Sequence, residues 1–249
     1  DRWCTYCIIP SVRGPIRSRP VDEIAAEAQS LAEAGFKEVV LTGIHLTSYG
    51  RDVKDGTTLL DAIRAAHDVQ GIERVRLGSL EPVVVTEEFV AGIAQMPKVC
   101  HQFHLALQSG SDTVLARMRR RYTSGEFLTA CAMLRRAFED CALTTDVMTG
   151  FPGETQAEFD ETKDTCTKAG FARMHVFPYS EREGTKAAIM PDSVPRHIRE
   201  ERARELIALG RVLEKNALAA RVGKEEDVLV EEIDGQGSGV GYTGGYMRV

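Results

Sequence analysis

The sequence lacks several features that would place it in familiar protein classes. No apolar run approaches the roughly 18 residues that a membrane-spanning helix needs, and the longest, such as residues 83–85, are short. Residues 1–4 are polar and have no apolar core, so we expect no signal peptide. The chain has no initiator methionine either, and we expect it to be a piece of a longer protein. These absences predict a cytoplasmic protein with no membrane partner.

Cysteine is scarce as well, because six residues in a chain of 249 are too few for a disulfide scaffold. A reduced setting fits this number better. Four of the six are irregularly spaced beside apolar residues, where we expect buried free thiols: Cys100, Cys131, Cys141 and Cys166. Only Cys4 and Cys7 form a motif, C-x2-C.

A basic excess, which many nucleic-acid-binding proteins carry, is missing too, since the formal net charge is −6. The charges are unevenly distributed, however. Arginines cluster within residues 13–19 and again within 117–121, whereas acidic residues gather within 225–234. A local basic patch can bind phosphates on an acidic chain, although each cluster alone could equally be the solvated face of a helix.

What the sequence does contain is a repeated alternation of strand-like and helix-like segments. Strands are expected within residues 37–43, 74–80, 102–108, 143–149 and 173–177, and helices within 20–35, 59–66, 87–95, 125–139 and 156–168. Strands that alternate with helices pair in parallel through crossovers. The predicted fold class is therefore α/β. A partial (β/α)6 TIM-like barrel, with one strand preceding the chain, is favoured over a doubly wound sheet.

The pattern changes after Pro195. Residues 196–221 are expected to form one long, charged helix that ends at Gly223. The segments 228–231 and 241–249 then indicate short strands with glycine-rich turns, the start of a small β domain. We therefore expect a barrel core at residues 1–221 and the beginning of a β domain at 222–249.

The loops after the strands contain most of the candidate functional residues. In a (β/α) barrel, functional groups lie after the C-terminal ends of the strands. Glycine there lets a ligand approach the backbone, and glutamine, serine, threonine and glutamate supply hydrogen bonds. A turn with a helix N-cap explains any single loop, but it explains five together less well. These loops are residues 42–45, 79–82, 108–112, 150–155 and 178–182.

The spacing of Cys4 and Cys7 alone is ambiguous. With Trp3 in front it imitates a thioredoxin redox site, but such a site needs a helix that opens at the first cysteine. The following residues, 8–10, include a proline and are not expected to start a helix. A zinc site would need a second ligand pair, for which Cys100 and His101 with His104 are the candidates.

The run from Cys4 onward nevertheless resembles the radical S-adenosylmethionine (SAM) enzymes, specifically the methylthiotransferases. The signature of that family is C-x3-C-x2-C, so its first cysteine would fall immediately before Asp1. Further motifs match in the same order along nearly the whole chain: Arg13-Gly14 with Arg17-Ser18-Arg19, Leu107-Gln108-Ser109-Gly110-Ser111, Met118 with Arg120 and Tyr122, Asp146 before Gly150-Phe151-Pro152-Gly153-Glu154-Thr155, and Phe177-Pro178-Tyr179-Ser180. Residues 228–249 resemble part of a TRAM domain, the tRNA-binding β barrel of the family.

The resemblance implies a set of cofactors and partners. Cys4 and Cys7, with a third cysteine, would hold a [4Fe-4S] cluster whose open iron binds SAM. One-electron cleavage of SAM would then give a radical that abstracts hydrogen. A second [4Fe-4S] cluster, in an N-terminal domain outside this chain, would deliver sulfur. The implied partners are tRNA and a reductant of the flavodoxin or ferredoxin type.

The resemblance also assigns roles to individual residues. The residues expected to meet SAM, from its amino group through its methionyl and ribose groups to its adenine, are Thr42, Gly43, Glu81, Gln108, Ser109, Met148 and Gly150. Tyr6 would either stack near the cofactor or simply pack. Arg13 and Arg17, which lie beside the site, would contact tRNA.

The loop after the first strand indicates the substrate. Its sequence, Leu41-Thr42-Gly43-Ile44-His45 with Tyr49-Gly50 following, resembles the branch that adds a methylthio group at C2 of threonylcarbamoyl-adenosine 37 beside the anticodon. The branches acting on isopentenyl-adenosine in tRNA or on a ribosomal protein stay open. Two functions of other classes also stay open: a thiol–disulfide oxidoreductase and a non-catalytic RNA-binding module.

Overall fold

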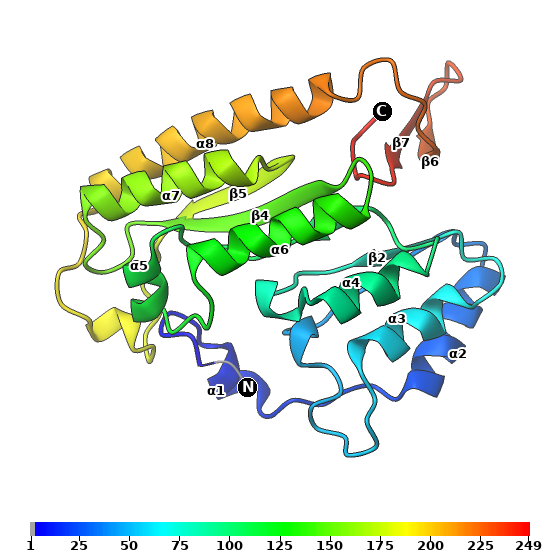
Figure 1. Ribbon diagram of the computed structural model, residues 1–249, viewed down its shortest axis with the longest axis horizontal. Helices are drawn as coiled ribbons and strands as arrows, with labels where there is room; N and C mark the ends of the chain where they lie inside the picture. The colour runs from blue at the N-terminus through cyan, green and yellow to red at the C-terminus, as the bar shows by residue number, and fades with distance from the viewer. Residues whose placement is uncertain (1–2) are drawn as a thin grey trace.

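Five parallel strands form the centre of the protein in a computed structural model that describes residues 3–249 (Figure 1). They are β1 Glu38–Leu41, β2 Arg74–Leu77, β3 Gln102–His104, β4 Ala142–Thr149 and β5 Arg173–Pro178. β1 pairs with β2, and β3, β4 and β5 pair in that order. A parallel bridge between Leu80 and Leu105 joins the two sets. The strands therefore follow chain order across an α/β sheet that, within the described residues, stays open. This confirms the predicted partial barrel.

The connecting helices pack against the sheet through one continuous apolar core. They are α2 Val21–Glu33, α3 Leu59–His67, α4 Glu87–Ala94, α6 Ser124–Ala137 and α7 Gln156–Ala169, each within two residues of its predicted ends. Phe103, Phe127 and Phe159 are fully buried in this core, and burial of such a side chain contributes roughly 1.5–3 kcal/mol. The core thus fixes the strands whose C-terminal ends support the functional loops.

Two short helices were not expected from the sequence. Helix α1, Ile9–Arg13, begins at the residue before Pro10, so the prediction that residues 8–10 do not start a helix was wrong. Proline is tolerated there because the first N–H groups of a helix need no intrahelical partner. The helix still opens after Cys7 and not at Cys4, which removes the thioredoxin arrangement. Helix α5, Asp112–Arg117, follows the loop after β3.

Strands β2 and β3 are also shorter than predicted, because beyond Leu77 and His104 the chain keeps only isolated bridges to the neighbouring strands. Beyond β3, Gln108 makes only an isolated bridge to Val147, and its φ of 64° lies in the left-handed region. A non-glycine residue there marks a sharp turn. The predicted strand ends, Leu80 and Gln108, therefore stay bonded to neighbouring strands but lie outside the regular ladder.

The C-terminal part consists of a long helix and a hairpin. Helix α8, Arg196–Ala219, packs on β4 and β5, and β6 Val228–Ile233 pairs antiparallel with β7 Gly239–Thr243 (Figure 1). Two arginines of β2 hold the hairpin. Arg74 donates hydrogen bonds to the carbonyl oxygens of Tyr242 (2.8 Å) and Asp227 (2.6 Å), and the Arg76 guanidinium lies 4.7 Å from the ring centre of Tyr246. The hairpin is thus attached to the sheet it follows.

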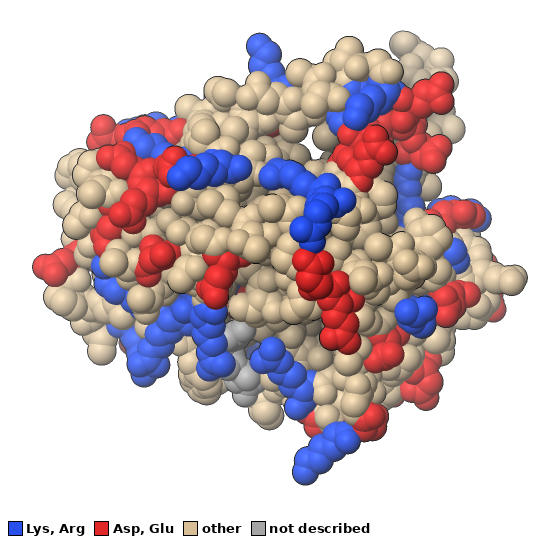
Figure 2. All heavy atoms as spheres, viewed as in Figure 1, with Lys and Arg blue, Asp and Glu red and all other residues tan. Residues whose placement is uncertain are grey.

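Both signs of charge are interspersed on the surface, with local groups of each (Figure 2). Figure 2 shows basic side chains grouped around α1 and α5 and acidic side chains grouped near the C-terminal hairpin. No helix within residues 3–249 combines the length and the apolar character needed to cross a membrane.

Candidate cofactor site

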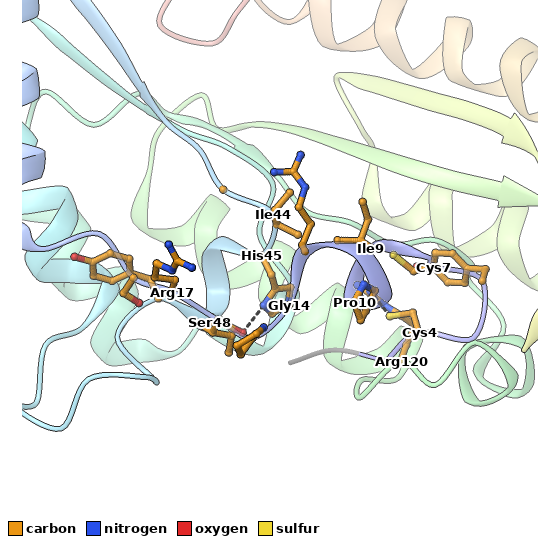
Figure 3. Close-up of a pocket in the computed structure, with 17 residues that line it drawn as sticks. Cys4, Cys7, Ile9, Pro10, Gly14, Arg17, Ile44, His45, Ser48 and Arg120 are labelled. Atoms are coloured by element: carbon orange, nitrogen blue, oxygen red, sulfur yellow. Dashed lines mark hydrogen bonds between the residues drawn. The ribbon is translucent and has the colours of Figure 1, made fainter. Parts of the chain in front are cut away.

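A cavity of about 400 Å³ lies where the N-terminal segment passes the loop after β1 (Figure 3). Six of the residues for which the sequence indicates a possible site role line it: Cys4, Tyr6, Cys7, Arg13, Arg17 and Gly43. Figure 3 shows the two cysteines and Arg120 together at one end and Arg17 at the other. The folded chain therefore brings the expected cluster ligands, one expected SAM contact and both expected tRNA contacts to one place.

The two cysteines belong to a tight turn. The Cys7 N–H donates to the Cys4 carbonyl oxygen (3.1 Å), and both thiols are free and partly exposed. Thiolate is the ligand that iron–sulfur clusters require, so this pair fits two of the three positions that the resemblance implies. Residues 3–249 contain no group of three or more Cys, His, Asp or Glu side chains that could hold a metal. The zinc alternative at Cys100, His101 and His104 therefore has no support in the described part of the chain.

A buried charged network lies beside Cys4. Arg120 Nη2 is 3.0 Å from Glu81 Oε1, and His45 Nε2 is 3.1 Å from Glu81 Oε2. Arg120 Nη1 donates to Cys4 Sγ over 3.4 Å, and Arg120 Nε donates to the Tyr122 hydroxyl over 3.0 Å. Glu81, expected as a SAM contact, thus holds the two side chains, Arg120 and His45, that themselves line the cavity.

Burial sets the protonation states around this network. Burial raises the pKa of Tyr122 and that of Tyr6. The neighbouring thiol of Cys4 raises the pKa of Tyr6 further. Both hydroxyls are therefore hydrogen-bond donors at neutral pH. Burial lowers the pKa of Arg120, but Tyr122, Tyr6 and Glu81 outweigh that effect and raise it, so the guanidinium stays charged.

The loop after β1 leaves its backbone open. Gly43 lines the cavity, and a Cβ placed on it would meet no atom within 4 Å. Glycine is expected where a ligand must approach the main chain. Thr42 precedes it but does not line the cavity.

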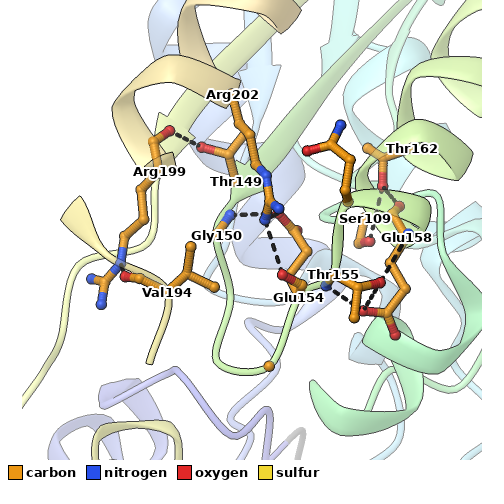
Figure 4. A network of polar contacts seen from close by, with 12 residues as sticks. Ser109, Thr149, Gly150, Glu154, Thr155, Glu158, Thr162, Val194, Arg199 and Arg202 are labelled. Atoms are coloured by element: carbon orange, nitrogen blue, oxygen red, sulfur yellow. Dashed lines mark hydrogen bonds and ion pairs between the residues drawn. The ribbon is translucent and has the colours of Figure 1, made fainter. Parts of the chain in front are cut away.

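The other expected SAM contacts lie in packed surroundings instead of the cavity (Figure 4). Ser109 is fully buried and shares a hydrogen bond with Thr162, and a Cβ on Gly150 would lie 2.3 Å from Cγ of Arg199. Gln108 is buried at the turn after β3, and Met148 is buried in a second apolar cluster with Phe151 and Tyr179. Roles for these four in SAM binding stay predictions.

Sequence reasoning assigned no role to Arg120 or His45. Arg120 lies in a run of three arginines, 119–121, of which only Arg120 turns inward, whereas Arg119 and Arg121 are exposed. The family motif includes Arg120 but does not show which way its side chain points, because that direction depends partly on Glu81, which is distant in sequence, as well as on the nearby Tyr122. His45 was noted only as a mark of the substrate branch.

The four cysteines outside the motif should be inert. Burial raises the pKa of Cys100 to about 11 and that of Cys131, Cys141 and Cys166 to about 12. Because the thiolate is the reactive form, iodoacetamide at pH 8 should alkylate only Cys4 and Cys7 in the cluster-free folded protein. Peptide mass spectrometry measures this, and guanidinium-unfolded protein, in which all six should react, is the control. Rapid labelling of any of the four in the folded state contradicts the assignment.

A second polar network predicts a pH effect (Figure 4). Glu158 caps α7 through Thr155 and accepts hydrogen bonds from Arg117 (2.9 Å) and Thr113 (2.5 Å). Burial alone would raise the pKa of Glu158, but these hydrogen bonds lower it to about 2. Since that value lies below the unfolded value of 4.5, the charged form stabilises the fold above about pH 4.5. This stabilisation is lost as the pH falls toward about 2.

The variant Glu158→Gln tests this effect, because glutamine keeps the capping geometry but not the charge. The difference in the free energy of unfolding between wild type and variant should be constant above about pH 5 and shrink toward zero near pH 2. Glu161→Gln, an exposed change on the same helix, should show no such trend. A difference that does not change with pH would refute the role of the charge.

Comparison with known proteins supports the resemblance. Residues 1–166 match the radical SAM superfamily. The chain is 40% identical over 253 residues to the threonylcarbamoyladenosine tRNA methylthiotransferase MtaB of Bacillus subtilis, covering 100% of this chain and 56% of that protein. It is 43% identical over 236 residues to the tRNA-2-methylthio-N(6)-dimethylallyladenosine synthase of Acidothermus cellulolyticus, covering 95% of this chain and 48% of that protein. The chain thus spans about half the length of the curated relatives it matches.

Solved structures show the same fold at low sequence identity. Coproporphyrinogen III oxidase (HemN) from Escherichia coli superposes with a TM-score of 0.60 at 13% identity, over 98% of this chain and 62% of that one. The radical SAM methyltransferase TsrM from Kitasatospora setae gives 0.62 at 18%, over 75% and 36%. These structures bear on the fold alone. Together with the match over residues 1–166, they lead to one conclusion: the chain belongs to the radical SAM superfamily.

Proposed function

We propose that this chain is the radical SAM part of a tRNA methylthiotransferase, an enzyme that adds a methylthio group to an adenosine beside the anticodon. The observation that carries the proposal is the cavity that Cys4 and Cys7 share with Gly43, Arg13 and Arg17. Curated relatives from two tRNA-methylthiolating branches match nearly the whole chain at about 40% identity. Membership of the superfamily implies a [4Fe-4S] cluster and SAM.

The residues around the cavity would have separate roles in binding the cofactors. Cys4 and Cys7 would hold the cluster, which, with SAM bound, supplies the radical chemistry. Gly43 leaves room for a ligand at the backbone, and the Glu81–Arg120 pair fixes the wall next to Cys4. The protein thereby contributes orientation and a shaped cavity, while the cofactor contributes the reaction.

The finer proposal concerns the substrate, for which we favour threonylcarbamoyl-adenosine 37 over isopentenyl-adenosine. Identity does not decide, because relatives in the two branches match this chain at 40% and 38–43%. The support is the loop at residues 41–50, with His45 held by Ser48 and Glu81 at the cavity. We further propose residues 222–249 as the start of a TRAM-like RNA-binding domain. A cytoplasmic location, a flavodoxin- or ferredoxin-type reductant and a second [4Fe-4S] cluster in an N-terminal domain complete the proposal.

The test is a nucleoside analysis. Protein from the complete gene is reconstituted anaerobically with iron and sulfide, then incubated with SAM, a reductant and tRNA that carries either threonylcarbamoyl- or isopentenyl-adenosine but no methylthio group. Liquid chromatography with mass spectrometry should find the methylthio product of the threonylcarbamoyl form. The isopentenyl product instead would correct the branch, and neither product from a cluster-loaded protein would overturn the function.

Arg13 and Arg17 should contribute to tRNA affinity without affecting the cluster. Both line the cavity and are exposed, and neither contacts Cys4 or Cys7 by hydrogen bond. Replacing both with glutamine should weaken tRNA binding and make the salt dependence shallower by about two counterions. Filter binding across a salt series measures both quantities, with Arg196→Gln on α8 as the matched charge control. An unchanged slope would exclude phosphate contact.

A further inference from the structure

Arg120 donates a hydrogen bond from Nη1 to the sulfur of Cys4, at 3.4 Å. The arginine side chain is only 7% exposed, and it reaches the cavity from the segment after α5, more than a hundred residues away in the sequence. A charged donor directed at one of the two cysteine sulfurs makes the pair asymmetric, because no comparable donor to Cys7 is found within the described residues.

The direction of Arg120 is fixed from two other sides. Nη2 lies 3.0 Å from a carboxylate oxygen of Glu81, itself only 6% exposed, and Nε donates to the Tyr122 hydroxyl at 3.0 Å. That hydroxyl donates in turn to the carbonyl oxygens of Ala106 (2.6 Å) and Leu107 (2.9 Å) in the loop after β3. The guanidinium is planar and presents its donors in a rigid fork. With Nε and Nη2 held in this way, Nη1 is directed at Cys4.

We propose that Arg120 is a positioning residue that raises the reduction potential of the cluster by hydrogen bonding to the Cys4 thiolate. Hydrogen bonds to ligand sulfurs are among the factors that set the potential of an iron–sulfur cluster. A positive donor withdraws electron density from the sulfur, so it stabilises the more negative, reduced state. The redox step is the gain of one electron by the cluster from the external reductant, and Arg120 itself gains or loses no proton or bond.

This inference rests on the proposed cluster site, and it competes with one other role for the same side chain. An arginine in the cavity could instead bind the carboxylate of SAM, as charge-assisted pairs of that kind are strong. The two roles predict different potentials in the absence of SAM, since only a hydrogen bond to Cys4 would then affect the reduction potential of the cluster. The potential therefore has to be measured both with and without SAM.

The experiment uses protein from the complete gene, reconstituted with iron and sulfide, in four forms. Arg120→Gln removes the charge and the fork. Arg120→Lys keeps the charge but cannot reach Cys4, Glu81 and Tyr122 together. Arg121→Gln removes the same charge from an exposed neighbour with no hydrogen bond to Cys4. Because Arg120→Gln removes one charged partner of the buried Glu81, the double variant Glu81→Gln/Arg120→Gln is prepared as well.

The readout is the midpoint potential from a redox titration followed by electron paramagnetic resonance, normalised to assembled cluster. Without SAM, Arg120→Gln and the double variant should show about a tenfold lower ratio of reduced to oxidised cluster at a fixed potential, which is a midpoint about 59 mV more negative. Arg120→Lys should fall between these variants and wild type, and Arg121→Gln should match wild type.

Three results would overturn the proposal. One is an unchanged potential without SAM in the double variant, with weakened SAM binding, which would assign Arg120 to SAM. Another is an equal shift of the midpoint potential in Arg121→Gln, which would show that any nearby positive charge has this effect and that the hydrogen bond to Cys4 is not needed. The third is failure of both Arg120→Gln variants to assemble a cluster while Arg121→Gln does, which would assign Arg120 to assembly. None of these depends on tRNA modification, so failure of the proposed function would be recognised separately, by a loaded wild type that modifies no tRNA.

Discussion

Replacing either Cys4 or Cys7 with alanine should abolish cluster assembly and all tRNA methylthiolation while the protein stays folded. Both thiols line one cavity and neither lies in the apolar core, so removal of either takes away a ligand without leaving a core void. A [4Fe-4S] cluster that leaves one iron open for SAM is held by only three thiolates, so the loss of one leaves a second iron without its protein ligand. Iron content, visible absorption and nucleoside analysis of the anaerobically reconstituted variants measure the loss.

The matched control is Cys141→Ala. Cys141 is partly buried and free, packs against the main core and does not line the cavity. This variant should keep full iron and activity, with at most a modest loss of stability of about 1 kcal/mol. Stable stoichiometric iron in Cys4→Ala or Cys7→Ala would show that the cluster is held elsewhere.

Replacing Arg202 with alanine should destabilise the fold by about 3–5 kcal/mol, because it leaves a buried carboxylate without its cation. Arg202 Nη1 lies 2.8 Å from Glu154 Oε1, and the two side chains are only 7% and 1% exposed (Figure 4). The same carboxylate oxygen accepts the N–H of Gly150 at 2.8 Å. This pair therefore joins α8 to the loop after β4, and its loss should loosen both.

Arg196→Ala on the same helix provides the control. Arg196 also pairs with a glutamate, Glu200, at 2.7 Å, but its side chain is 91% exposed. Exposed pairs of this kind contribute little, so we expect no resolvable change in urea-induced unfolding. Combining Arg202→Met with Glu154→Gln should recover part of the lost stability, since replacing both buried charges removes the uncompensated one. Equal losses in Arg202→Ala and Arg196→Ala would refute the role of burial.

The order and direction of the strands could be predicted from the sequence because local signals agree. β-branched runs alternate with helices that start at capping residues, such as Thr123 with Glu126 and Thr155 with Glu158, and such alternation favours parallel pairing. The helix at Ile9–Arg13 was missed because proline was taken as a barrier, whereas it lies in the first turn, where its missing N–H costs nothing.

The site was only partly predictable, for a physical reason. Cys4, Cys7 and Gly43, which line one cavity, could be selected from the sequence through the resemblance to a family, because the C-x2-C spacing alone left a redox site and a zinc site open. A glycine, however, indicates only that another group approaches the backbone closely, and the sequence does not show whether that group is a ligand or a side chain. At Gly150 it is the side chain of Arg199. Likewise, the contact of Arg120 with Cys4 depends on Tyr122 in the same segment and on Glu81 in the loop after β2, which together fix the direction of the arginine. No pattern in a single sequence records that arrangement.

Electron paramagnetic resonance can show in one experiment whether Cys4 and Cys7 hold a [4Fe-4S] cluster that binds SAM, as we propose. Protein from the complete gene, reconstituted anaerobically and reduced, is measured by electron paramagnetic resonance before and after SAM is added. We expect the signal of a reduced [4Fe-4S] cluster that changes on addition of SAM and is missing from the double variant Cys4→Ala/Cys7→Ala. A signal that does not change when SAM is added, or that persists in the double variant, would show that the proposed cluster site is wrong.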